Sequence, residues 1–235
     1  MVTGQTINEP ITGISSMSTR NVLADLVEEY ERLSGQQVVV ESVGGVEAAR
    51  RVQHGEPFDF VVLAADAIDR LAAAGRVDPR SRVDLARSGV AIAVAAGAPR
   101  PDIGTEAAVR DAILAARSIG YSTGPSGSHL TRLFERWGIA ETIAPPIVQA
   151  PPGVPVGTLV ARGEVELGFQ QLSELMHLQG IEVIGSLPVE IQVVTVFTAA
   201  ICTASARHEA AKALLSFLAS PKADSAKRGH GMESA

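Results

Sequence analysis

Short apolar segments with strand-like patterns alternate along this chain of 235 residues with segments of helical periodicity. Residues 58–64 (FDFVVLA) have little polar interruption, which is typical of a strand buried on both faces of a sheet. Residues 106–116 and 208–219 have the periodicity of amphipathic helices. This alternation predicts an α/β protein with mainly parallel sheets flanked by helices. The other predicted strands are residues 38–41, 90–95, 118–121, 147–149, 167–170, 183–185 and 191–202, and the other predicted helices include residues 66–74 and 171–179.

Four segments rich in Ser, Thr, Gly or Pro run directly into helical patterns. A helix start leaves several backbone N–H groups without a helical partner and carries the positive end of the helix dipole, so it can hold an oxygen of an anion. In α/β sheets, ligands bind beyond the carboxyl ends of strands, where helices begin. We therefore predict a cleft that holds a small anion through backbone and hydroxyl donors. The four segments are residues 12–20, 41–45, 121–128 and 151–157.

The charge of the chain argues against a nucleic-acid partner. Its formal net charge is −6, and Lys and Arg form no block that could provide the basic face such a partner needs. An anionic ligand must therefore be met by local donors. A chain of this length with 46% hydrophobic residues can bury a sizeable core, as one large domain or as two lobes.

Few residues have the pattern of a metal or redox site. The single Cys202 lies in an apolar run, which excludes an internal disulfide and a cysteine-based metal cluster. No pair of His residues has metal-ligand spacing with an intervening Glu. We expect no metal site and no cofactor.

The chain has no segment typical of membrane insertion or export. No stretch reaches the roughly 18 apolar residues of a membrane span, and residues 1–10 lack a basic region followed by an apolar one. We expect no direct membrane insertion and a cytoplasmic protein as the sequence is written, or a periplasmic one where a leader was removed.

Two stretches resemble crossings between lobes, residues 84–89 and 185–193. The first precedes the predicted strand 90–95, and the second precedes the long β-branched segment near the end of the chain. They predict a first lobe of residues 10–86 plus 190–235 and a second lobe of residues 87–189.

Arg20 stands where the first of the four segments meets its helix. A cation is unfavourable at the positive end of a helix dipole, so its presence suggests that an anion is bound nearby. A guanidinium can hold a carboxylate through two parallel hydrogen bonds. We interpret Arg20 as a carboxylate ligand, with an exposed charge as the alternative.

Two titratable residues are candidates for acid–base chemistry. His129 follows the third segment and could act as a base or donor beside a bound substrate. Glu47 could be a general base if the start of its helix points the side chain into the cleft. The alternatives are a helix residue without a role for His129 and a solvated first-turn acid, paired with Arg50, for Glu47. Ser88 lies at the first predicted crossing and could face the cleft.

Residues 49–66 (ARRVQHGEPFDFVVLAAD) contain a helix, a Gly-x-Pro-x-Asp motif, a strand and an Ala-Asp pair. With residues 14–32, 156–174 (VGTLVARGEVELGFQQLSE) and 210–222, they resemble the type II periplasmic solute-binding proteins, particularly the molybdate-binding branch. The resemblance covers nearly the whole chain. It implies the two-lobed fold of that family, with the ligand cleft between the lobes.

The resemblance also implies contacts at the four segments. Two of these positions carry Gly and Gln where the branch has hydroxyl side chains, and Arg20 adds a cation to a site that uses neutral donors. These departures favour an organic acid over molybdate. Of the adjacent residues Gln170 and Gln171 only one can face the ligand, and the family register selects Gln171. The implied contacts are Ser15, Ser16 or Ser18, then Gly44, Gly45 and Val46, then Ser126, Gly127 and Ser128, and finally Val156 and Gln171.

Two functions are compatible with this pattern. The favoured one is a solute-binding protein that closes on a small anion, an organic polycarboxylate rather than molybdate or another oxyanion, with ABC transporter membrane subunits as partners if it is exported. The alternative is an isomerase on the same fold, because enzymes that isomerise aconitate resemble the same branch. That reaction is an allylic proton shift and needs carboxylate ligands and one base, His129 or Glu47.

Overall fold

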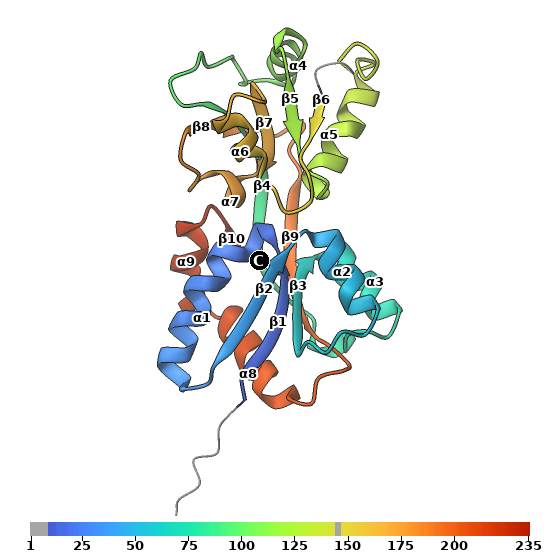
Figure 1. The fold of residues 1–235 in the computed structure, drawn as a ribbon, viewed down its shortest axis with the longest axis vertical. Coiled ribbons are helices and arrows are strands. Elements are labelled where there is room, and N and C mark those ends of the chain that lie inside the picture. The colour runs from blue at the N-terminus through green and yellow to red at the C-terminus, as the bar shows by residue number, and fades with distance from the viewer. Residues whose placement is uncertain (1–8, 144–146) are drawn as a thin grey trace, which may run out of the picture.

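The computed structural model describes residues 9–143 and 147–235, so most of the amino-terminal segment 1–10 lies outside the described residues. Figure 1 shows two lobes, one above the other, joined by two strands, β4 (Val83–Ala95) and β9 (Val194–Ile201). The predicted α/β fold with two lobes is confirmed. Its sheet is mixed, because β4 and β9 run antiparallel to strands that are otherwise parallel within each lobe.

The lower lobe is built on three parallel strands in the order β2-β1-β3, with β9 antiparallel beside β3. Successive residues of β3 point to opposite faces of the sheet. Phe60 and Val62 pack with α1 and α8, whereas Val61 and Leu63 pack with α2 and α3. Both faces of the strand are therefore covered, which explains its continuous apolar sequence. The elements are β1 (Ile11–Ser16), α1 (Arg20–Ser34), β2 (Val38–Val43), α2 (Gly45–Gln53), β3 (Phe60–Ala64), α3 (Ala65–Ala73) and α8 (His208–Leu218).

The upper lobe continues the same sheet. The second half of β4 pairs with β7 and β8 in antiparallel register, and β5 lies parallel between β7 and β6. Its main core is closed by Val109 and Ile113 of α4 and by Leu130 and Phe134 of α5. The elements are α4 (Glu106–Ala115), β5 (Ile119–Tyr121), α5 (Pro125–Arg136), β6 (Ile147–Gln149), α6 (Val156–Ala161), β7 (Leu167–Gln171), α7 (Leu172–Leu175) and β8 (Ile181–Ser186).

The end of the chain returns to the middle of the molecule. After α8, the helix α9 (Asp224–Gly229) leads to β10 (Glu233–Ser234), which pairs with β4. Three 3-10 helices complete the described elements: η1 (Met17–Thr19), η2 (Pro79–Ser81) and η3 (Pro221–Ala223). Among the described residues, no helix combines the length and the apolar character needed to cross a membrane.

The segment 12–20, whose Ser, Thr and Gly content is typical of a turn before a helix, is a strand over most of its length, because residues 12–16 belong to β1 in the middle of the lower sheet. Gly13, Ser15 and Ser16 interrupt its apolar pattern, and the first two interruptions have a tertiary cause. A Cβ on Gly13 would lie 2.3 Å from the ring of Phe60. The Ser15 hydroxyl is 2.8 Å from that of Ser42 on the neighbouring strand.

Other differences concern the bounds of elements. Residues 84–89, predicted as a crossing, form the first half of the continuous strand β4, so the predicted lobe boundary after residue 86 falls within that strand. The predicted boundary after residue 189 falls in the segment that precedes β9. The predicted helix 171–179 is reduced to the four residues of α7, and α5 begins at Pro125 instead of residue 129.

Gly127 allows α5 to begin close to the turn that precedes it. A Cβ at this position would lie 1.7 Å from the backbone oxygen of Ser122. We expect Gly127→Ala to lower the free energy of unfolding by about 3 kcal/mol, since a backbone atom cannot move aside as a flexible side chain would. Gly229→Ala is the matched control, because a Cβ there has no neighbour within 4 Å. Equal stability of the two variants in urea denaturation would contradict this account.

Candidate functional site

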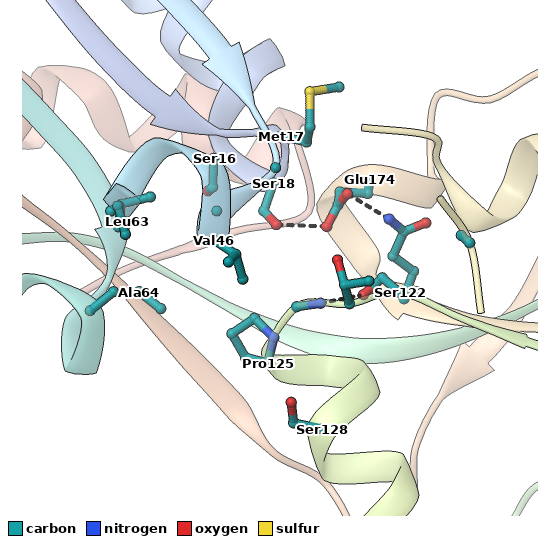
Figure 2. A pocket seen from close by; sticks show the side chains of 18 of the residues that line it. Ser16, Met17, Ser18, Val46, Leu63, Ala64, Ser122, Pro125, Ser128 and Glu174 are labelled. Carbon is teal, nitrogen blue, oxygen red and sulfur yellow. Dashed lines mark hydrogen bonds between the residues drawn. The ribbon is translucent and has the colours of Figure 1, made fainter. Parts of the chain in front are cut away.

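A cavity of about 630 Å³ lies between the two lobes and is lined from both. Cavities of this size commonly hold small molecules. Figure 2 shows the cavity with Ser16, Ser18 and Val46 from the lower lobe and Ser122, Pro125 and Ser128 from the upper lobe around it. All four predicted anion-binding segments contribute residues to its wall. The topology causes this convergence, because the segments follow the carboxyl ends of strands of the two lobes.

The lower wall offers hydrogen-bond donors that are not used within the protein. Ser16 ends β1 and is 6% exposed, and its hydroxyl has no hydrogen-bond partner among the described residues. It lies beside the start of α2, since a Cβ on Gly45 would be 3.6 Å from the Cβ of Ser16. A buried hydroxyl without a partner costs free energy, so its presence next to unpaired helix N–H groups indicates a site for an acceptor.

The upper wall is formed by the turn before α5. Gly124 is the N-cap of α5 and provides no side-chain cap, so the first N–H groups of this twelve-residue helix have no side-chain acceptor at the cap. The hydroxyls of Ser122 and Ser126 are 3.1 Å apart, and Ser122 Oγ accepts a hydrogen bond from the N–H of Gly124 at 3.3 Å. Ser128 lines the cavity one turn into the helix.

Glu174 of α7 is the centre of a hydrogen-bond network that joins the two lobes. The hydroxyl of Ser18, from the lower lobe, donates to Glu174 Oε1 at 2.6 Å (Figure 2). The amide Nε2 of Gln170 donates to Glu174 Oε2 at 2.5 Å, and Gln170 Oε1 accepts from the N–H of Val156 at 2.7 Å. Both oxygens of the carboxyl group are therefore fixed at the cavity wall.

The environment of Glu174 changes its acidity. Burial raises the pKa of the Glu174 carboxyl group to about 7, although the hydrogen bonds from Ser18 and Gln170 act in the opposite direction. A carboxyl group with this pKa exchanges protons readily at neutral pH. Glu174 thus has the properties of a general acid or base, and it lines the cavity.

The structure separates the predicted site residues into two groups. Those that line the cavity are Ser16, Ser18, Gly44, Gly45, Val46 and Ser128. Those outside the cavity lining are Ser15, Arg20, Glu47, Ser88, Ser126, Gly127, His129, Val156 and Gln171.

The predicted chemistry depended on Arg20, His129 and Glu47. Each of these side chains is either exposed or bonded to a group outside the cavity. Arg20 is an exposed residue at the first position of α1. His129 Nε2 is 2.7 Å from the carbonyl oxygen of Ile191. Glu47 accepts two hydrogen bonds from Arg50, at 2.6 and 2.7 Å, and these lower the pKa of its carboxyl group. Glu47 is therefore a solvated first-turn acid, the alternative considered for it above.

Gln171 and Ser88 lie where the chain crosses between lobes. The amide of Gln171 is oriented so that both its nitrogen and its oxygen form hydrogen bonds. The nitrogen donates to the carbonyl oxygens of Ser88 and Gly89 at 2.9 and 3.2 Å, and the oxygen accepts from Thr195 Oγ1 at 2.7 Å. Gln171 therefore connects β7 to β4 and β9. Its neighbour Gln170 lines the cavity instead, because adjacent strand residues face opposite sides.

The remaining predicted contacts support the wall from behind. The N–H of Val156 is used by Gln170, and the hydroxyl of Ser126 lies beside that of Ser122. Ser15 faces away from Ser16 on β1 and pairs with Ser42. Among the described residues, no group of three or more His, Cys, Asp and Glu side chains is placed to hold a metal ion.

The sequence pattern gave no indication of Glu174 or Arg132 as residues of the cavity. Glu174 follows the strand 167–170 in a segment that has the pattern of a helix start, where acids are common for electrostatic reasons. Its raised pKa comes from burial in the folded protein, and its hydrogen-bond partner Ser18 lies 156 positions away in the chain. A signal for Gln170 was present, since one of two adjacent glutamines had to face the cleft.

Comparisons with known proteins agree with this architecture. A family model described as bacterial extracellular solute-binding protein matches residues 11–233. Aconitate isomerase from Pseudomonas sp. is 37% identical over 234 residues, which cover 96% of this chain and 89% of that protein.

Two solved structures share the fold at low sequence identity. The periplasmic molybdate-binding protein of Azotobacter vinelandii aligns with a TM-score of 0.78 at 21% identity, covering 94% of this chain and 98% of that one. The sulfate-binding protein SubI of Mycobacterium tuberculosis aligns with a TM-score of 0.76 at 16% identity, covering 95% and 86%.

The raised pKa of Glu174 makes the stability of the protein depend on pH. A carboxyl group whose pKa is higher in the folded state stabilises the fold below its unfolded value of 4.5, and this contribution is lost as the pH rises through about 7. We expect Glu174→Gln, which removes the ionisation, to gain stability relative to the wild type between pH 5 and pH 8, by up to about 3 kcal/mol. Thermal unfolding of both proteins across this range measures the difference, and a constant difference would contradict the raised pKa.

Proposed function

The chain belongs to the family of bacterial extracellular solute-binding proteins, and on this premise we propose that it is an isomerase that interconverts cis- and trans-aconitate by an allylic proton shift. The observation that carries this proposal is the Glu174 carboxyl group, with a pKa of about 7, in the wall of the cavity between the lobes. The aconitate isomerase that is 37% identical across nearly the whole chain supports it.

The position of Glu174 favours chemistry over simple retention of an anion. A site that only holds a polycarboxylate gains nothing from a carboxyl group in its wall, because an ionised Glu174 would repel the ligand. A proton acceptor is necessary for the isomerisation, and its optimal pKa lies near the working pH. The hydrogen bonds from Ser18 and Gln170 hold the carboxyl group in one orientation.

The proposed reaction moves one proton and one double bond. The Glu174 carboxylate takes a proton from the methylene carbon of the substrate, and the C–H electron pair forms a new double bond while the original double bond opens. The negative charge passes onto an adjacent carboxylate of the substrate, where Ser16 and the N–H groups at the start of α2 can stabilise it. Glu174 then returns the proton to the former vinylic carbon, so no oxidant or reductant is needed.

Incubation of the protein with cis-aconitate, followed by proton NMR, tests this function directly. We expect trans-aconitate to form, and Glu174→Gln to lower kcat at least about 100-fold because the proton acceptor is lost. His129→Ala is the control, since His129 lies outside the cavity lining and we expect near wild-type turnover. Full turnover by Glu174→Gln would eliminate Glu174 as the base.

The pH dependence of the reaction provides an independent measurement. Glu174 must be ionised to accept a proton, so we expect kcat/KM to fall as the pH decreases through about 7 and to level off above it. The profile of kcat/KM reports the titrating groups of the free enzyme. A profile that stays flat from pH 6 to pH 8 would contradict the role of Glu174.

The second candidate is a solute-binding protein that closes on a polycarboxylate and delivers it to the membrane subunits of an ABC transporter. The exposure of Val46, which lines the cavity and is 70% exposed, favours a closing motion, because closure would bury this apolar side chain. Tight binding of cis-aconitate without interconversion would support this candidate over the isomerase.

A further inference from the structure

The charged side chains that line the cavity are Asp66 and Arg70 of α3, Arg132 of α5, and Glu174. Arg70 is already paired, since its Nη1 lies 2.8 Å from Asp66 Oδ2 on the same helix. Arg132 has no hydrogen bond or ion pair with any described residue, and it is exposed. The cavity therefore contains one cation whose charge is not compensated by a side chain of the described chain.

Arg132 is placed to act together with the start of its own helix. Ser128 and Arg132 are four residues apart on α5, so they share a face of the helix, and both line the cavity. The next arginine of α5, Arg136, pairs with Glu106 of the upper lobe and is absent from the cavity wall. Helix α5 thus presents the free guanidinium of Arg132 to the cavity, whereas the guanidinium of Arg136 forms an ion pair with Glu106 of α4.

A tricarboxylate would need one more strong partner than the helix starts supply. The unpaired donors at the start of α2, with Ser16, can hold one carboxylate from the lower lobe. The start of α5 can hold a second from the upper lobe. A third carboxylate would add negative charge to a cavity that already contains the ionisable Glu174, so a positive charge would favour its binding.

Resting on the proposed function, we propose that Arg132 binds the third carboxylate and thereby makes the site selective for tricarboxylates over dicarboxylates. A guanidinium suits this role because its fork of N–H groups matches the two oxygens of a planar carboxylate. Arg70 is a weaker partner because Asp66 neutralises it. Arg20, which the sequence suggested for the same chemistry, lies outside the cavity lining.

Calorimetric titration of the full chain with two unreactive acids tests this assignment. Tricarballylate has three carboxylates and no double bond, and glutarate lacks the central carboxylate. We expect Arg132→Gln to weaken tricarballylate binding about 10- to 100-fold and glutarate binding less than about 3-fold. Arg132→Lys keeps the charge without the fork, so we expect an intermediate loss.

Arg20→Gln is the matched control, because it removes another exposed arginine, one that lies outside the cavity lining. We expect it to leave both affinities unchanged. An equal effect of Arg132→Gln on the two acids, or no effect, overturns the role of Arg132 even if the wild-type protein interconverts aconitate. Failure of the wild-type protein to bind tricarballylate and to turn over cis-aconitate overturns the proposed function together with this inference.

Discussion

The antiparallel pairing of β4 with β9 is the constraint on which the rest of the structure depends. The first half of β4 pairs with β9 in the lower lobe, and its second half pairs with β7 and β8 in the upper lobe. Because one strand continues through both lobes, the end of β7 is positioned at the crossing, where Gln171 bonds to β4 and β9. Gln192 acts in the same place, since its Oε1 accepts from the N–H of Val90 at 2.9 Å and its Nε2 donates to the Val90 carbonyl oxygen at 3.0 Å. The two glutamines therefore add side-chain hydrogen bonds to backbone groups of β4 where the strand changes partners.

Side chains alternate along β7, so one of its two adjacent glutamines has a structural role and the other faces the cavity. Gln171 faces the crossing, whereas Gln170 faces the cavity, donates to Glu174 and accepts from the N–H of Val156. The short helix α7 begins directly after this pair, so Glu174 follows the strand end by three residues and reaches Ser18 of the opposite lobe. Desolvation of its carboxyl group costs free energy, and the two hydrogen bonds offset only part of that cost, which is why the pKa remains raised.

The cavity combines neutral donors with one free guanidinium and one carboxyl group of altered acidity. Neutral backbone and hydroxyl donors suffice for a small oxyanion, and they form the parts of the wall that follow the carboxyl ends of β1, β2 and β5. In the proposed function, the guanidinium of Arg132 is the planar partner of a carboxylate and the carboxyl group of Glu174 is the proton acceptor. The likeness to molybdate- and sulfate-binding structures describes the fold, and the proposed chemistry rests on Glu174 and Arg132 of this chain.

The sequence by itself determined the α/β class, most of the strands and the places where helices start after strands. Strand β6 has the predicted bounds, and all four segments predicted to bind an anion line the cavity, because strand ends, turns and helix starts are local features. Local pattern could not identify β1, whose Gly13 and Ser15 are explained by Phe60 and Ser42 on other strands. It also could not distinguish Arg132 from Arg20, or Gln170 from Gln171, because each choice depends on which face of an element the packing turns toward the cavity. Only the tertiary structure decided the state of Glu174, since desolvation and a hydrogen bond from a residue 156 positions away set its pKa.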